Sequence, residues 1–208
     1  MDLLGEKLAG GVATLGLELD ESVVERLLAY LALLIKWNRA FNLTAVRDPA
    51  EMVVKHLLDS LAVLPHLKGE RFVDVGAGAG LPGIPLAIAR PALSFTEIDS
   101  AGKKVRFMKQ AVRELGLVNV EAHHARVEGW RPEAPFDGVL SRAFASIADM
   151  VTVAGHLRGE EGRLYAMKGR VPDEELAALP AGWAVERIEP LTVPGLDAER
   201  CLVVLARG

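Results

Sequence analysis

Hydrophobic residues recur at helical spacing through the first third of the chain. Between residues 22 and 37 they fall three and four positions apart, which indicates one buried helix face. Ser22-Val-Val-Glu25 matches a capping box and is expected to open this helix. Asp48-Pro49-Ala50-Glu51 is a second start signal, with a cap, a proline and an acid ahead of another apolar stripe. Residues 1–19 indicate a short helix or an irregular lead-in, so residues 1–67 are predicted to form a helical cap on the rest of the chain.

From Arg71 onward, short apolar runs alternate with helical patterns, which favours a mainly parallel sheet covered by helices on both faces. The last two strands, joined through Pro194-Gly195, are expected to be antiparallel. We therefore predict an α/β fold with a seven-stranded Rossmann-like sheet in residues 68–208, packed with the cap as one globular unit. The strands are expected at 71–75, 93–98, 119–123, 138–140, 163–167, 183–193 and 201–206, and helices at about 82–89 and 102–115.

Composition supports one sizeable folded unit. The chain has 208 residues and half of them are hydrophobic, which is enough for a substantial core. Its start lacks the basic-then-apolar order of a signal peptide and no apolar run is long enough to span a bilayer, so no membrane partner is expected. Cys201 is the only cysteine, which excludes an intramolecular disulfide and points to a reducing cytosol. Because Cys201 lies in an apolar strand-like run, we interpret it as a core residue rather than a nucleophile for pyrimidine-C5 methylation.

The segment RFVDVGAGAGLPGIP at residues 71–85 carries the strongest chemical signal. Glycines permit positive φ angles and let a ligand lie against the backbone. A dinucleotide fingerprint of the form G-x-G-x-x-G begins only at Gly78, two residues late for that motif. With Asp74 before the first glycine, the pattern instead resembles motif I of the class I S-adenosylmethionine (SAM) methyltransferases. The three alternate glycines of that motif are Gly76, Gly78 and Gly80.

Further candidates follow the carboxyl ends of the predicted strands, where open α/β sheets bind their ligands. Asp99 ends the second strand, 23 positions after Gly76, as expected for an acid that binds the ribose hydroxyls of a nucleotide. Glu97 is the weaker candidate, because we expect it to face the other side of the strand. The remaining candidates at such ends are Val127, Glu128, Arg142 and Lys168.

The formal charge of −4 means that any RNA contact needs a local basic patch rather than a basic protein. The helix expected at 102–115 provides such a patch. Two interpretations of it have equal weight: contacts with RNA phosphates, or a helix face that is merely solvated. A second cluster mixes Trp37 and Phe41 with basic residues, although packing of these aromatics onto the core is the favoured interpretation. The candidate RNA-binding residues are Arg39, Arg47, Lys103, Lys104, Arg106 and Lys109.

Five segments, spread from the N-terminal third nearly to the end, are similar to those of one known family. They are KWNRAFNLTAVRD (36–48), HLLDSL (56–61), DVGAGAGLPGIPLAI (74–88), FDGVLSRAFAS (136–146) and YAMKG (165–169). The chain resembles the bacterial small-subunit rRNA methyltransferase G family, RsmG or GidB. The resemblance implies a class I SAM-methyltransferase fold with an N-terminal helical extension. It also implies methyl transfer from SAM to N7 of one guanine in the decoding-region loop of 16S rRNA, guanine 527 in that family's rRNA numbering, with S-adenosylhomocysteine as the product.

The same resemblance implies contacts with the cofactor, in addition to those expected of the motif residues Gly78, Gly80 and Asp99. It further implies 16S rRNA or the 30S subunit as partner, a cytoplasmic location, a monomer and no metal. Relatives usually have an apolar pair before the acid, whereas this chain has Glu97-Ile98 before Asp99. The implied cofactor contacts are Gly76, Leu81, Val127, Glu128 and Arg142.

The chemistry of N7 methylation is consistent with these residues. Enzymes that methylate exocyclic amines typically carry an Asp/Asn-Pro-Pro-aromatic motif after the fourth strand, but here Ser141-Arg142-Ala143-Phe144 stands there. Guanine N7 has a lone pair and no proton to remove, so alignment in a dry pocket suffices and no general base is required. No catalytic residue is assigned beyond positioning by Arg142 or Lys168. His56 and Asp59, three apart on one helix face, are a candidate catalytic pair, although a hydrogen-bonded polar pair at a domain seam is the favoured interpretation.

Two other classes of function stay open from the sequence. One is a SAM-dependent methyltransferase acting on a small molecule, for which the basic helix would be incidental. The other is a non-catalytic module that binds a nucleotide or rRNA through the same loop. An NAD-linked dehydrogenase fits poorly, because the glycine register and Asp74 do not suit it.

Overall fold

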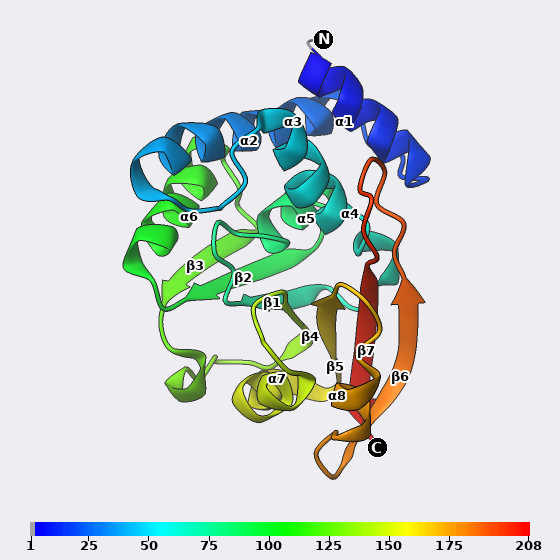
Figure 1. Ribbon diagram of the computed structural model, residues 1–208. Helices are drawn as coiled ribbons and strands as arrows, with labels where there is room; N and C mark the ends of the chain where they lie inside the picture. Colours follow the sequence, from blue (N-terminus) through cyan, green and yellow to red (C-terminus); the bar gives the residue numbers. More distant parts are fainter. Residues whose placement is uncertain (1–2) are drawn as a thin grey trace.

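Seven strands form one mixed sheet, in which five strands pair in parallel and the last two form an antiparallel edge (Figure 1). The computed structural model describes residues 3–208, so Met1 and Asp2 of the expected cap lie outside the described residues. The order across the sheet is β3-β2-β1-β4-β5-β7-β6; β1 to β5 pair in parallel and β7 is antiparallel to both of its neighbours. The strands are β1 (Arg71–Val75), β2 (Ser94–Asp99), β3 (Val120–His124), β4 (Phe136–Ser141), β5 (Arg158–Lys168), β6 (Trp183–Pro190) and β7 (Cys201–Arg207).

Helices cover both faces of this sheet, because side chains along each strand alternate between two hydrophobic clusters. Phe72 of β1 joins one cluster, whereas Val73 and Val75 join the other. On the Phe72 side lie α1 (Leu3–Thr14), α2 (Glu21–Phe41), α3 (Pro49–Met52), the π-helix η1 (Val53–Leu58), α4 (Asp59–Leu61), η2 (Leu64–His66), α5 (Gly83–Ala89) and α6 (Gly102–Glu114). On the other side lie η3 (Val127–Gly129), α7 (Ile147–Ala154), η4 (Gly155–Leu157) and α8 (Asp173–Ala177).

The strand order reverses between β1 and β4, which pair directly although two strands separate them in sequence. In open α/β sheets such a reversal leaves a crevice at the carboxyl ends of the strands, where ligands bind. The chain segments that follow β1, β2, β3, β4 and β5 all reach this edge. The predicted α/β fold with antiparallel C-terminal strands is thereby confirmed, and the functional site is expected at the reversal.

The two helix-start signals have different outcomes. Asp48 caps α3 as predicted, because its carboxylate accepts a hydrogen bond from the Glu51 backbone N–H at 2.9 Å. The capping box at Ser22 is wrong: α2 begins one residue earlier, at Glu21, and its N-cap position is Asp20. The helix also runs beyond Trp37 to Phe41, where Asn42 adopts a left-handed conformation with φ of 49° and ends it.

Trp37 packs onto the core, as the favoured interpretation of its segment predicts. Its ring lies 5.7 Å from that of Phe107 on α6, edge to face, and so joins the end of α2 to α6. The Phe41 ring contacts that of Trp37 in a tilted arrangement, with the ring centroids 5.2 Å apart, but Phe41 stays 39% exposed. In the part of the chain that the structure describes, no helix has both the length and the apolar composition needed to cross a bilayer.

Candidate functional site

The loop after β1 adopts the backbone that its glycines allow. Gly76, Gly78 and Gly80 have φ angles of 70°, 63° and 82°, which side-chain-bearing residues rarely adopt. A Cβ atom on Gly78 would meet no atom within 4 Å, so the space above it is open to a ligand. A Cβ on Gly80 would instead strike Ile84, which gives this glycine a packing role.

Asp99 lies against this loop at the end of β2. One carboxylate oxygen accepts the Gly78 N–H at 2.9 Å and the other accepts the Ala101 N–H at 2.8 Å. Lys104 places its Nζ 3.6 Å from the first oxygen. Each carboxylate oxygen keeps a further lone pair, so Asp99 is oriented by the backbone and still able to accept hydroxyl groups.

A cavity of about 350 Å³ opens beside Gly76 and Asp99. Val127 and Glu128 form part of its wall, because η3 follows β3 at the same edge of the sheet. The structure therefore brings four of the predicted cofactor residues, from three separate segments, around one space.

A smaller cavity of about 190 Å³ lies on the other side of the loop and shares Gly76 and Ala143 with the first. Its wall includes Gly78 and Leu81, whereas Gly80 faces away. Arg142 lines this second cavity and is not among the residues that line the first. The predicted contacts thus divide between two adjoining spaces.

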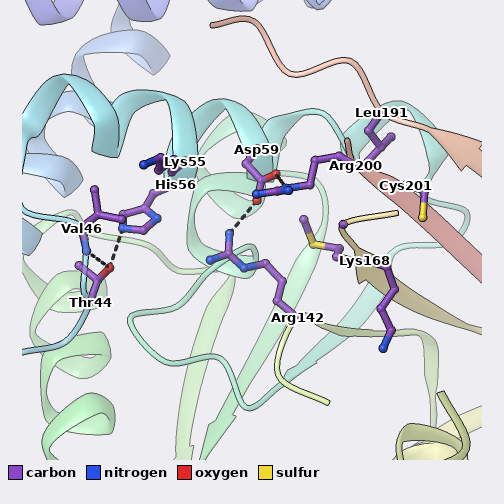
Figure 2. Close-up of a pocket in the computed structure, with 12 residues that line it drawn as sticks. Thr44, Val46, Lys55, His56, Asp59, Arg142, Lys168, Leu191, Arg200 and Cys201 are labelled. Atoms are coloured by element: carbon purple, nitrogen blue, oxygen red, sulfur yellow. Dashed lines mark hydrogen bonds and ion pairs between the residues drawn. The ribbon is translucent and has the colours of Figure 1, made fainter. Parts of the chain in front are cut away.

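A third cavity, of about 480 Å³, continues from the second toward β7 (Figure 2). Thr44, His56 and Arg142 line both and form the wall between them. Asp59 lies in the third cavity, where one oxygen accepts a hydrogen bond from Arg142 Nη1 at 2.9 Å and the other from Arg200 Nε at 3.0 Å. The three cavities thus adjoin one another in a row along the carboxyl ends of the strands, each sharing wall residues with the next.

Lys168 borders the third cavity but its ammonium group is already engaged. Its Nζ lies 2.9 Å from a Glu175 carboxylate oxygen and donates to the carbonyl of Ala145 at 3.2 Å. In Figure 2 this amine points away from Asp59. Lys168 therefore holds the segment after β4 against α8.

His56 and Asp59 do not form the mutual pair that their spacing would allow. His56 Nε2 is hydrogen-bonded to the Thr44 hydroxyl at 2.9 Å, while Asp59 binds the two arginines. Burial lowers the pKa of His56 to about 4, and the nearby positive charge of Arg142 acts in the same direction. Asp59 thus joins the N-terminal helices to the segments that follow β4 and precede β7, whereas His56 contacts the segment between α2 and α3 and is neutral near pH 7.

A buried acid pair lies beneath the glycine loop, and the expectation for Glu97 was wrong. Residues 97 and 99 are two apart in β2 and share a face, so Glu97 lies deeper on the same side, directly beside Asp74 of β1. Both acids are fully buried, and Asp74 accepts the Gly83 N–H at 3.0 Å. Burial raises the pKa of both carboxyl groups, and the negative charge of Asp74 raises that of Glu97 further.

The candidate RNA-binding residues divide into free and engaged groups. Lys103 donates to the carbonyl of Phe41 at 3.0 Å and so ties α6 to the end of α2, beside which α6 lies in Figure 1. Lys104 faces Asp99 in the first cavity, and Arg47 donates to Asn42 Oδ1 at 2.6 Å. Of the six candidates, five are exposed, namely Arg39, Arg47, Lys103, Arg106 and Lys109, whereas Lys104 is half-buried.

Two features of the cleft were missed from the sequence. Arg200 reaches Asp59 from the start of β7, and no motif marks it, because residues 59 and 200 meet only through the tertiary fold. Tyr30 donates its hydroxyl to the Ala79 carbonyl at 2.7 Å, which fixes the glycine loop from α2. Cys201 is buried as predicted, but it also borders the third cavity.

Comparisons with known proteins agree with this geometry. The sequence model of the family described as rRNA small subunit methyltransferase G, GidB, matches residues 23–203. Proteins named ribosomal RNA small subunit methyltransferase G in Erwinia tasmaniensis and in an Azoarcus species are each 56% identical to this chain, and each alignment covers 97% of it. These alignments cover 98% and 96% of the two relatives.

Solved structures share the fold at low sequence identity. Mitomycin 7-O-methyltransferase MmcR superposes with a TM-score of 0.64 and 18% identity, covering 99% of this chain and 67% of that one. A SAM-dependent methyltransferase from Thiobacillus denitrificans, in complex with S-adenosyl-L-homocysteine, gives a TM-score of 0.56 and 14% identity, covering 73% of this chain and 90% of that one. The sheet described above is thus the class I SAM-methyltransferase fold.

Proposed function

Because the chain belongs to the rRNA small subunit methyltransferase G family, we propose that it transfers a methyl group from SAM to 16S rRNA. We place the transfer on N7 of a single guanine in the decoding-region loop. The observation that carries this proposal is the row of adjoining cavities: the second borders the glycine loop, and the third, large enough for a base, has no free general base among the described residues that line it.

The residues of the cleft fit the cofactor. The open space above Gly78 and the oriented carboxylate of Asp99 suit a nucleoside lying against the loop. In this proposal Asp99 binds the ribose hydroxyls, and Val127 and Glu128 flank the adenine in the first cavity. Arg142 binds the methionine carboxylate from the second cavity, since only part of its guanidinium is used by Asp59.

The ionisable groups of the second and third cavities are poor bases, which is what methylation at N7 permits. When bound, SAM supplies an electrophilic methyl group on its sulfonium. Asp59 is held by two arginines, and the low pKa of His56 leaves it a weak base near pH 7. Ser141 donates its hydroxyl to the Val75 carbonyl at 2.7 Å, so it also lacks a base role. The work of the chain is then to align the guanine and exclude water.

The rRNA is expected to approach over the flank formed by α2 and α6. Lys103, Arg106 and Lys109 lie exposed there beside Arg39, within reach of the cleft edge that Lys104 occupies. Basic side chains of this kind bind phosphates and set orientation rather than read sequence. We further propose that the protein acts as a monomer in the cytoplasm, where its 30S substrate is found.

The decisive experiment is methyl transfer from labelled SAM to 30S subunits and to 16S rRNA that lack this modification, followed by mapping of the labelled base. Label on N7 of one decoding-region guanine is the expected result. Label on another base or atom would overturn the assigned target. Absence of label, despite SAM binding, would overturn rRNA as the substrate.

A further inference from the structure

The third cavity has an excess of positive charge at its centre. Two of its bordering lysines are neutralised locally: Lys55 pairs with Glu51 and Lys168 with Glu175, each at 2.9 Å. His56 is neutral. The remaining charged groups that line this cavity, among the described residues, are the Asp59 carboxylate and the two arginines that hold it. One negative and two positive charges leave a net charge of +1.

Asp59 fixes both guanidinium groups but does not use all of their donors. Its side chain is only 6% exposed, whereas those of Arg142 and Arg200 are 27% and 29% exposed. Arg200 donates through Nε to Asp59 and through Nη1 to the Glu199 carbonyl at 2.9 Å. A guanidinium carries five N–H donors, so Nη2 of Arg200 remains available at the partly open face.

The position of Arg200 separates it from the cofactor. Arg142 borders both the second and the third cavity, whereas Arg200 borders the third alone of these two. A ligand of Arg200 therefore lies on the far side of Arg142 from the glycine loop. A guanidinium with a fixed orientation favours a planar or tetrahedral oxyanion that accepts two N–H groups.

We propose that Arg200, oriented by Asp59, binds a backbone phosphate of the RNA nucleotide whose base enters the third cavity. This inference rests on the proposed function, because it assigns the substrate's phosphate to one side chain. The net charge of +1 on the cluster favours an anionic ligand, and a phosphodiester carries one negative charge. Asp59 acts as a positioning residue, because it holds Arg200 near the base. Its negative charge also offsets the positive charge of Arg200, which would otherwise repel the base as methylation makes N7 cationic.

Three variants test the site. Arg200→Gln removes both the positive charge and the fork, that is, the pair of N–H donors by which a guanidinium binds two oxygens. Arg200→Lys keeps the charge but loses this fork. Arg163→Gln is the matched control, since Arg163 also forms an ion pair, with Glu186, is 24% exposed and borders none of the three cavities. For each variant we would measure kcat and KM with unmodified 30S subunits, RNA affinity across a salt series, SAM affinity and the thermal midpoint.

Arg200→Gln is expected to raise KM for 30S subunits on the order of ten-fold or more, as for loss of one charge-assisted hydrogen-bonded contact. The slope of log affinity against log salt should fall by about 0.7–0.9, the value of one lost phosphate contact. Arg200→Lys should restore the slope and only part of the KM. Arg163→Gln should change neither, and SAM affinity should be unaltered in all three variants.

A loss of SAM affinity in Arg200→Gln, with RNA affinity and salt slope as in the control, would assign Arg200 to the cofactor carboxylate and overturn the proposal. If the glutamine variant does not fold, Arg200→Lys decides: an unchanged KM for 30S subunits would contradict a phosphate fork. If the wild-type protein methylates no rRNA, binding of guanosine 5′-monophosphate and guanosine still tests the site. A preference for the monophosphate that disappears in the Arg200 variant supports it, and equal preferences overturn it.

Discussion

At the scale of single residues, the cleft depends on positions where one atom more or less decides binding. Gly78 is open on the side where a Cβ would project, and its N–H is bound by Asp99. Gly76, by contrast, has the Ala143 Cβ 2.6 Å from the place of its missing side chain. The sequence marked both glycines, but only the structure shows that the space for a side chain is open at Gly78 and is filled by Ala143 at Gly76, although both glycines line a cavity.

Gly78→Ala should reduce SAM affinity at least about ten-fold, because the added methyl group would occupy the ligand's space beside the loop. Gly116→Ala is the matched control: its φ of 61° is close to the 63° of Gly78, and it too has no atom within 4 Å of a Cβ. Both changes should cost roughly 1–2 kcal/mol of stability through backbone strain. Calorimetric titration with SAM checks this, and equal affinity losses in the two variants would show that strain alone is responsible.

Glu97 is a second residue at which one chemical group decides a property of the whole protein. Its folded-state pKa is raised by burial and by Asp74, so the native protein keeps a proton that the unfolded chain releases above its ordinary pKa of 4.5. The stability from this proton is fully present below that value and is lost as the pH rises through the raised pKa. His56 has the opposite sign, since its stability contribution is lost as the pH falls from 6.5 toward about 4.

Glu97→Gln should therefore gain stability relative to the wild type as the pH rises, by up to about 1.4 kcal/mol per pH unit. The carboxamide has nearly the same shape and cannot ionise, and His56 is unchanged in the comparison. Denaturant unfolding of both proteins across a pH series measures the difference, with the exposed Glu25→Gln as control. A difference that does not vary with pH would mean that Glu97 holds no proton in the native state.

At the scale of elements, the two helix-start signals in the N-terminal part differ in whether a side chain reaches the helix backbone. Asp48 does so at α3, whereas Asp20 occupies the N-cap position of α2 with no side-chain hydrogen bond to the helix. The helix that Asp48 opens then becomes the π-helix η1 before α4 begins at Asp59. Nothing in the apolar stripe indicated the wider turn, which brings His56 and Asp59 to the cleft and is common at functional sites.

Asp48→Ala should lower the free energy of unfolding by about 1 kcal/mol, the usual value of an N-cap hydrogen bond. Asp20→Ala removes the same charge near a helix start without breaking a cap bond, and it should cost no more than about 0.5 kcal/mol. Urea unfolding of the two variants compares them directly. Equal losses would show that charge near the helix dipole, rather than the cap bond, accounts for the effect.

At the scale of the whole molecule, a protein of net charge −4 is proposed to bind RNA through one basic flank. Arg106 and Lys109 are exposed on α6, and Lys103 joins them to the end of α2. Lys104 lies on the same helix but faces Asp99, so it belongs to the cofactor cavity rather than to the free flank. The helical pattern placed these basic residues on one helix, and the tertiary structure then gave Lys104 a different environment from the others.

Replacing Lys103, Arg106 and Lys109 together by Gln should weaken rRNA binding and lower its log–log salt slope by about two, since each lost phosphate contact contributes about 0.7–0.9. SAM affinity should stay as in the wild type. A triple variant of Lys7, Arg90 and Arg207, all exposed and outside α2 and α6, carries the same change in charge. Equal slopes in the two triple variants would assign the effect to total charge and remove the flank from the RNA interface.

The sequence by itself determined the strands, most of the longer helices, the glycine loop and Asp99, because hydrophobic periodicity and backbone freedom are local properties of consecutive residues, but it predicted neither α7 nor α8. It predicted β1 at Arg71–Val75 correctly, and it contained the motifs on which the family resemblance rests. Only the tertiary structure decided that Asp59 joins Arg142 to Arg200, that His56 contacts Thr44, and that Glu97 shares a buried site with Asp74. Those contacts link separate segments of the chain, and their strength comes from burial and charge, which exist only once the sheet and helices are packed.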